Sequence, residues 1–486
     1  MSAPWLPAHD CFPRRGDVKG ETRHPFLGGL LDLLGGERAA RARDLPGLAS
    51  ALLSGRGEAS GIALARQILT AYNGLSPEEK LWFLQVLADR FGSDPVRLER
   101  AIGNYRSDPG ARTATALHQA AEPRRQELIR RLNSAPGGTH ELVRMREDLL
   151  RDLVAREELE AVDADFVHLF SSWFNSGFLV LKRIDWSTPA HILEKIIRYE
   201  AVHAIASWDD LQRRLEPRDR RCFAFFHPRL VDEPLIFVEV ALTEEIPSAI
   251  APLLAEGRRP TDPHRATAAV FYSISNCQPG LRGVSLGNFL IKQVIDELKQ
   301  ELPALRTFVT LSPVSGFVAW LRRERESRDP ALLTTEEKST LESLDRPDWP
   351  ERPEVRKALK PILFAAVTHY LLLAKKGSGR PADPVARLHL NSGARLERVN
   401  WLGDLSPKGL SQGAGFMVNY LYDPAQIVGN HERFANKGEV VASSAVRKLL
   451  RRRSRSRSSG PTPAESGRSP SEKTAHRRAA GAIRNS

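Results

Sequence analysis

Hydrophobic residues in the first third of the chain recur at helical spacing. Between Ser76 and Gly92, a serine precedes a proline and two acids, and apolar residues then follow every three or four positions, as is typical of a capped helix. The stretch from Thr139 to Glu160 also has one apolar face, formed by Leu142, Met145, Leu149 and Leu153. We therefore predict an all-helical domain over residues 1–163 that serves packing or oligomerisation.

The pattern then changes to short runs of β-branched and aromatic residues. Three runs have strand length and are bounded by Pro, Asp and Gly: Arg221–Phe226, Leu235–Leu242 and Thr267–Ser275. Helical segments lie between and after them, at Pro189–Tyr199 and Asn288–Leu302. This mixture predicts an α+β protein, in which the helical domain is followed by an α/β domain over residues 164–440.

The C-terminal segment differs from both domains in its charge. Of the formal net charge of +12, about +10 resides between Arg447 and Ser486, which hold 12 Lys and Arg against 2 Asp and Glu. Such a composition buries too little apolar surface to offset the entropy lost on ordering. We predict that residues 441–486 form a disordered, basic tail rich in Arg and Ser, and that the body of the protein is close to neutral.

Signals for a metal site, a membrane span or secretion are weak. The three cysteines show no CxxC spacing, and no HxH or HExxH grouping is present. The best apolar run, Pro361–Ala374, is shorter than the roughly 18–20 residues that a bilayer span needs. The N-terminus contains acids and prolines instead of a secretory apolar core. We expect a cytoplasmic protein with no metal site and no membrane contact.

The stretch from Phe271 to Lys299 predicts an anion-binding site. A strand runs into a glycine-containing loop and then into an amphipathic helix. Unpaired backbone amides and the helix dipole at such a junction favour phosphate groups. The segment Arg282–Gly287 resembles the pyrophosphate loop of the GNAT acyltransferases, although Ser285 replaces a glycine of that pattern. The residues predicted to bind coenzyme A are Gln278, Arg282, Gly283, Ser285, Gly287 and Asn288.

Two further segments carry candidate catalytic side chains. The run Thr307–Ser312 reads as a strand that a proline breaks, and it leaves Ser312 at the strand end, where functional residues of α/β sheets tend to lie. His389 lies in a short apolar run before a turn. A histidine there is either a structural core residue or a general acid or base near neutral pH.

Together these segments resemble the malonyl-CoA decarboxylase family over roughly residues 70–425. The segments that carry the resemblance are FYSISNCQPGLRGVSLGNFLIK, TLSPVSGFVAWL, HLNSGARLERVNW and GAGFMVNYLY, supported by EPLIFVEVALT and EAVHAIASWDDLQRRL. The resemblance implies a helical domain followed by a GNAT-like catalytic domain. It also implies conversion of malonyl-CoA to acetyl-CoA and carbon dioxide without a metal, biotin or another prosthetic group.

The family's catalytic Ser and His match Ser312 and His389, and further active-site positions match Ser273 and Tyr422. A family position that is commonly an acid falls on Ser285, so a carboxylate role is lost there. Decarboxylation leaves a thioester enolate, which fixed hydrogen-bond donors must stabilise. We hypothesise that backbone amides and the Ser273 hydroxyl hold the thioester oxygen. Ser312 would then orient the malonyl carboxylate and His389 would supply the proton, with Tyr422 as a positioning group.

Two other function classes remain open on the sequence. A GNAT-type N-acyltransferase would use the same coenzyme A loop but would require an amine acceptor. A nucleic-acid-binding protein is suggested by the run RRRSRSR from Arg451 to Arg457, since arginine-rich segments bind phosphate backbones. The resemblance and the helical domain together suggest a homo-oligomer, and we expect nucleic acid not to be a partner.

Overall fold

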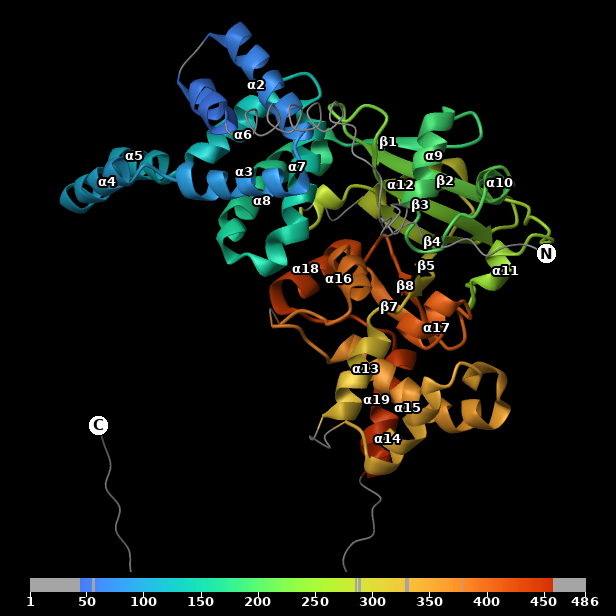
Figure 1. Ribbon diagram of the computed structural model, residues 1–486. Helices are drawn as coiled ribbons and strands as arrows, with labels where there is room; N and C mark the ends of the chain where they lie inside the picture. Colours follow the sequence, from blue (N-terminus) through green and yellow to red (C-terminus); the bar gives the residue numbers. More distant parts are fainter. Residues whose placement is uncertain are drawn as a thin grey trace, which may run out of the picture.

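The computed structural model describes residues 44–54, 57–284, 286, 290–327, 332–377 and 379–457. Helices come first in the chain and a mixed sheet with its covering helices follows (Figure 1). The predicted α+β class is confirmed. None of the helices in these ranges combines the length and the apolar run that crossing a bilayer would require.

The N-terminal part consists of helices up to residue 178. The α-helices are α2 (Glu58–Asn73), α3 (Pro77–Arg90), α4 (Pro95–Ser107), α5 (Ala111–Ala121), α6 (Arg124–Asn133), α7 (Gly138–Asp152) and α8 (Glu160–Trp173). Helix α3 begins as predicted, because Ser76 accepts a hydrogen bond from the Glu79 amide and the Glu79 carboxylate accepts one from the Ser76 amide. The single helix predicted over Thr139–Glu160 is wrong in its extent, since short 3₁₀ turns at Leu153–Ala155 and Glu157–Leu159 separate α7 from α8.

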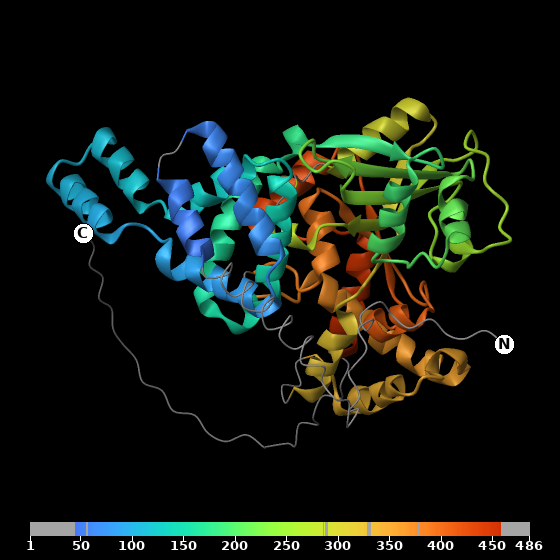
Figure 2. The same ribbon diagram turned by 45° about the horizontal axis from the view of Figure 1, so that its top comes forward.

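Helices α4 and α5 form a hairpin that projects away from the rest of the helical domain (Figures 1 and 2). Ala101 and Ala120 are the buried residues of the two helices. Val96 and Tyr105 of α4 are exposed. The hairpin therefore gains little from packing against its own chain.

The part of the chain after these helices is built on an eight-stranded sheet with the order β1-β2-β3-β4-β5-β8-β6, and β7 pairs with β8. Its strands are β1 (Val180–Ile184), β2 (Arg220–Phe226), β3 (Pro234–Thr243), β4 (Ala268–Asn276), β5 (Thr307–Thr310), β6 (Ser312–Pro313), β7 (Arg395–Asn400) and β8 (Met417–Leu421). Strands β4 and β5 pair in parallel, and the other pairs are antiparallel. The three strands predicted from β-branched runs correspond to β2, β3 and β4.

Helices cover both faces of the sheet. On one face, α9 (Ala190–Tyr199) and α10 (Trp208–Leu215) pack against alternate residues of β2 and β3. The other face packs against the following helices: α12 (Leu290–Glu301), α13 (Phe317–Glu326), α15 (Pro353–Leu372), α16 (Pro384–Asn391) and α18 (Ile427–Lys437). The remaining helices are α11 (Ala251–Leu254), α14 (Thr335–Leu341), α17 (Pro407–Gly413) and α19 (Ser444–Arg457).

Strands β4 and β5 part at the centre of the sheet. The amide of Leu311 donates to the carbonyl of Phe271, and beyond this bond the chain turns to pair Ser312 with Val418 of β8. Strand β4 instead continues along β3 to Asn276. The two strands therefore separate just after their last shared hydrogen bond.

A β-bulge in β4 lies beside this point. Val240 pairs with Phe271 and Glu239 pairs with Ser273, so Tyr272 is the extra residue. An extra residue reverses the side to which later side chains point. Phe271 consequently packs edge-on against Tyr422, whereas Ser273 reaches Glu200 at the end of α9, on the opposite face of the sheet.

The predicted tail boundary at residue 441 is wrong. The amide of Leu396 donates to the carbonyl of Val441, the Ser443 hydroxyl donates to the carbonyl of Glu397, and α19 contacts β7 and α15. The buried Val446 belongs to the main apolar core. Burial of apolar residues in the sequence AVRKLL offsets the conformational entropy lost when this segment is ordered. Residues 458–486 of the predicted tail lie outside the described residues.

We predict that Val446→Ala lowers the free energy of unfolding by about 2 kcal/mol, because it removes a buried side chain and leaves a cavity. Urea unfolding followed by circular dichroism measures this change. Val428→Ala is the matched control, since Val428 is 59% exposed, and it should change stability by less than about 0.5 kcal/mol. Equal effects of the two substitutions would show that α19 is not part of the folded core.

Candidate active site

His389 is the centre of the candidate site, and helix α16 positions it. The Asp383 carboxylate caps this helix by accepting a hydrogen bond from the amide of Ala386 at 2.7 Å, and Pro384 follows at the first helical position. The apolar run that carries His389 is therefore a helix. The helix buries the imidazole almost completely, with 2% of the residue exposed.

The structure brings Ser312, His389 and Tyr422 into one chain of hydrogen bonds. His389 Nε2 lies 3.1 Å from Ser312 Oγ, and His389 Nδ1 lies 2.8 Å from the Tyr422 hydroxyl. The imidazole also stacks on the ring of Tyr420, with 4.7 Å between the ring centroids. Three predicted residues from separate segments thus form one buried unit.

The hydrogens of this chain can be assigned by counting donors. Ser312 Oγ donates its one hydrogen to Thr310 Oγ1 at 2.9 Å, so it accepts from His389 Nε2. His389 Nδ1 then accepts from the Tyr422 hydroxyl. The imidazole is accordingly held as the Nε2–H tautomer, with the nitrogen that carries hydrogen directed at Ser312.

Burial keeps both His389 and Tyr422 uncharged. It lowers the pKa of the His389 imidazole to about 3, because the imidazolium would lose its hydration. It raises the pKa of the Tyr422 phenol above its usual value, with a smaller opposing effect from the Ser392 hydroxyl. A neutral imidazole and a protonated phenol agree with the donor count.

Ser273 lies apart from these three residues. Its hydroxyl donates to the Glu200 carboxylate, whose oxygens lie 2.8 and 2.7 Å away. A serine hydroxyl has one hydrogen to donate, and Ser273 donates it to Glu200. The hypothesis that Ser273 donates to a thioester oxygen therefore does not fit this arrangement, because Ser273 offers only lone pairs.

The predicted coenzyme A loop is partly described. Gln278 Nε2 donates to the carbonyl of Pro234 at 3.1 Å, and Gly283 has a φ of 82°, a conformation that favours glycine. Gly280 packs so closely on α7 that an added Cβ would lie 2.0 Å from the Val143 carbonyl oxygen. Ser285, Gly287 and Asn288 lie outside the described residues.

A cavity of about 480 Å³ adjoins this loop. Gln278, Arg282 and Gly283 line one side, and Leu388 and Ser392 line the other. Leu388 precedes His389 in α16, and Ser392 influences the Tyr422 phenol. The cavity therefore connects the predicted anion loop with the helix that carries His389.

Several residues of the site were not identified from the sequence. Thr310 and Tyr420 each lie two positions before a predicted residue, Ser312 and Tyr422. Residues two apart in a strand share a face, so this spacing was the available signal. Glu200 gave no such signal, because the contact with Ser273 joins residues that are 73 positions apart.

We predict that His389→Gln makes stability less sensitive to acid. The unfolded chain protonates this histidine near pH 6.5, whereas the buried imidazole has a pKa of about 3. Between these pH values the unfolded state binds the extra proton, so wild-type stability falls as pH falls, by about 1.4 kcal/mol per pH unit from this group. Urea unfolding between about pH 7 and about pH 5 measures the slope.

The exposed His118 on α5 provides the matched control, and His118→Gln should leave the pH curve as it is in the wild type. A His389→Gln curve parallel to the wild-type curve would contradict the assignment of a neutral, buried imidazole.

Comparisons with known proteins cover both parts of the chain. Residues 91–174 match the family described as "Malonyl-CoA decarboxylase N-terminal domain", and residues 177–460 match "Malonyl-CoA decarboxylase C-terminal domain". Mitochondrial malonyl-CoA decarboxylase of Anser anser anser is 36% identical over 412 residues, covering 77% of this chain and 81% of the relative. The enzyme of Mus musculus is 34% identical over 413 residues, covering 78% and 83%.

Solved structures give the same result. A malonyl-CoA decarboxylase from Rhodopseudomonas palustris is 58% identical, with a TM-score of 0.82, and covers 84% of this chain and 99% of its own. That from Cupriavidus metallidurans is 36% identical, with a TM-score of 0.66, and covers 85% and 99%. In the described ranges, no group of three or more His, Cys, Asp or Glu side chains is arranged to hold a metal ion. The matches to family models, curated relatives and solved structures show that the chain belongs to the malonyl-CoA decarboxylase family.

Proposed function

We propose that this protein converts malonyl-CoA to acetyl-CoA and carbon dioxide. The observation that carries the proposal is the Ser312–His389–Tyr422 unit. Its histidine lies on α16 between Leu388 and Asn391, which line a cavity that also borders the coenzyme A loop. Family membership supports the same reaction. The diphosphate would bind the loop near Arg282 and Gly283, and the acyl end would reach the buried unit.

The chemistry of the reaction fits uncharged donors. When the bond between the carboxylate and the α-carbon breaks, its electron pair moves into the thioester carbonyl and carbon dioxide leaves. A cation fixed on the carboxylate would stabilise the ground state and raise the barrier, because that charge moves away during the reaction. The Nε2–H of His389 can orient the carboxylate without holding a full counter-charge. Ser312 donates its own hydrogen to Thr310, so it holds the imidazole in place and does not donate to the carboxylate.

The enolate must then gain a proton at carbon. Its α-carbon is strongly basic, so the neutral Nε2–H of His389 is a sufficient donor. As the proton leaves Nε2, the Tyr422 hydroxyl stabilises the negative charge that develops at Nδ1. One proton from solvent restores the unit, which balances the proton that each turnover consumes.

We also propose that the protein uses no metal, biotin or other prosthetic group, and that it acts in the cytoplasm. The projecting α4–α5 hairpin supports a homo-oligomer formed through the helical domain, because its exposed Val96 and Tyr105 would be covered by a second copy. Sedimentation equilibrium of the full chain tests this assembly.

We predict acetyl-CoA formation from malonyl-CoA alone, unchanged by a chelator or by avidin. His389→Gln and Ser312→Ala should each lower kcat by about 10²–10⁴-fold, as expected for loss of a proton donor or its partner. Both variants should keep the wild-type affinity for coenzyme A within about twofold, because the loop lies on a separate segment. Coupled spectrophotometric assays and calorimetry measure these quantities.

The exposed His264 and Ser411 supply matched controls, and His264→Gln and Ser411→Ala should leave kcat unchanged. An absolute requirement for an amine acceptor would instead identify an N-acyltransferase. Equal losses of kcat and coenzyme A affinity in the His389 variant would contradict the separation of roles.

A further inference from the structure

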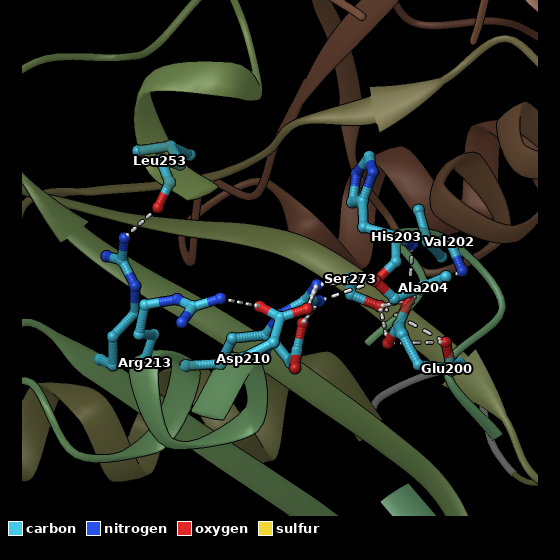
Figure 3. Close-up of polar contacts among 12 residues, drawn as sticks. Glu200, Val202, His203, Ala204, Asp210, Arg213, Leu253 and Ser273 are labelled. Atoms are coloured by element: carbon cyan, nitrogen blue, oxygen red, sulfur yellow. Dashed lines mark hydrogen bonds and ion pairs between the residues drawn. The ribbon is translucent and has the colours of Figure 1, made fainter. Parts of the chain in front are cut away.

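A second polar cluster lies on the opposite face of β4 from Tyr422. It comprises Glu200, Asp210, Arg214, Glu239 and Ser273, and we name it the Glu200 network (Figure 3). Glu200, Arg214, Glu239 and Ser273 are all buried. The mechanism proposed above uses none of its charged groups, although they lie in two segments that carry the family resemblance.

Glu200 is the centre of the contacts to β4. Its carboxylate accepts the hydrogen of Ser273 Oγ, and Oε1 also accepts the amides of Val202 and His203 at 2.7 and 2.8 Å. The Ser275 hydroxyl lies 3.3 Å from Oε2. One carboxylate thus ties the C-terminal part of β4 to the segment that follows α9.

Other groups hold that segment from two further sides. Arg214 donates to the carbonyl of His203 at 2.8 Å and to the carbonyl of Ala204 at 3.0 Å. Lys408 of α17 donates to the carbonyls of Ala201 and Val202. Residues 201–204 are therefore fixed, although Ala201 and Ala204 are exposed.

The position of Ser273 relates this network to the reaction. Phe271 is the last β4 residue with a partner on β5, and the strands part beyond it. Ser273 and Ser312 each lie two residues past that final pair, on the two strands that separate. Further along β4, Asn276 lines the cavity that adjoins the coenzyme A loop. The β4 segment from Ser273 to Asn276 therefore joins the Glu200 network to this cavity.

We propose that Glu200 is a positioning residue for decarboxylation. Its carboxylate accepts the hydrogen bond from Ser273 and the amides of Val202 and His203. These bonds fix the position of β4 where β4 and β5 separate, and we place the entry of the acyl group there. This inference rests on the proposed function. Glu200 acts through Ser273, so its loss misplaces the acyl group without weakening coenzyme A binding at the loop.

The test is a double-mutant cycle on the full-length protein with malonyl-CoA as substrate. Glu200→Gln and Ser273→Ala are each expected to lower kcat by about 10-fold or more, since small displacements of reacting groups have large effects on rate. The double variant should equal Ser273→Ala within about twofold, because the two residues act as one unit. The dissociation constant of coenzyme A should stay within about twofold of wild type in every variant.

Two further variants make the cycle decisive. Glu194→Gln is the matched control, since Glu194 lies on the same helix α9 and its side chain is 61% exposed, and it should keep wild-type kcat within about twofold. Glu200→Asp keeps the charge but shortens the reach by one methylene, and it should lower kcat about as much as Glu200→Gln. It therefore gives a result even if the Gln variant does not fold.

Two results would overturn the proposal. Wild-type kcat in a Glu200 variant of reduced stability would assign Glu200 a purely structural role. Losses that multiply in the double variant would show that Glu200 acts independently of Ser273. A wild-type protein without decarboxylase activity would refute the proposed function itself, and the wild-type assay alone reveals that outcome.

Discussion

The candidate site depends on the burial of one uncharged imidazole between two hydroxyl groups. His389 lies between Ser312 and Tyr422 and stacks on Tyr420. A buried imidazolium without a counter-ion is costly, and the pKa of His389 is lowered accordingly. The hydrogen that faces Ser312 is therefore fixed by the surroundings of the ring instead of by the pH of the solvent.

The fold supplies this environment by parting two strands. Because β4 and β5 separate after Phe271 and Leu311, Ser312 turns toward β8 and meets α16. The bulge at Tyr272 turns Ser273 to the other face, where Glu200 takes its hydrogen. The Ser312–His389–Tyr422 unit thus lies on one side of the point where the strands separate. On the other side, the Glu200 carboxylate fixes β4 by accepting a hydrogen bond from Ser273. This arrangement suits a reaction that moves negative charge without a fixed cation.

Much of the architecture could be predicted from the sequence, because periodicity reports which face of an element is buried. The strands β2, β3 and β4 and the capped helix α3 follow directly from it. The helix that carries His389 is short, and its apolar run alone does not predict it, although Asp383 and Pro384 provide a helix cap. Pattern alone could not reveal the bulge that separates Ser273 from His389, since one extra residue leaves no mark in composition.

The tautomer of His389 can be measured directly, and it decides whether the buried imidazole is neutral. Nitrogen-15 NMR of the protein labelled at its histidines, with His389→Gln used to assign the signal, reports which ring nitrogen carries hydrogen. We expect a neutral Nε2–H form that stays unchanged from about pH 7 down to about pH 5, well below the ordinary histidine pKa. A signal that titrates to imidazolium in this interval, or one from an Nδ1–H tautomer, would show that His389 is not held as the neutral Nε2–H form.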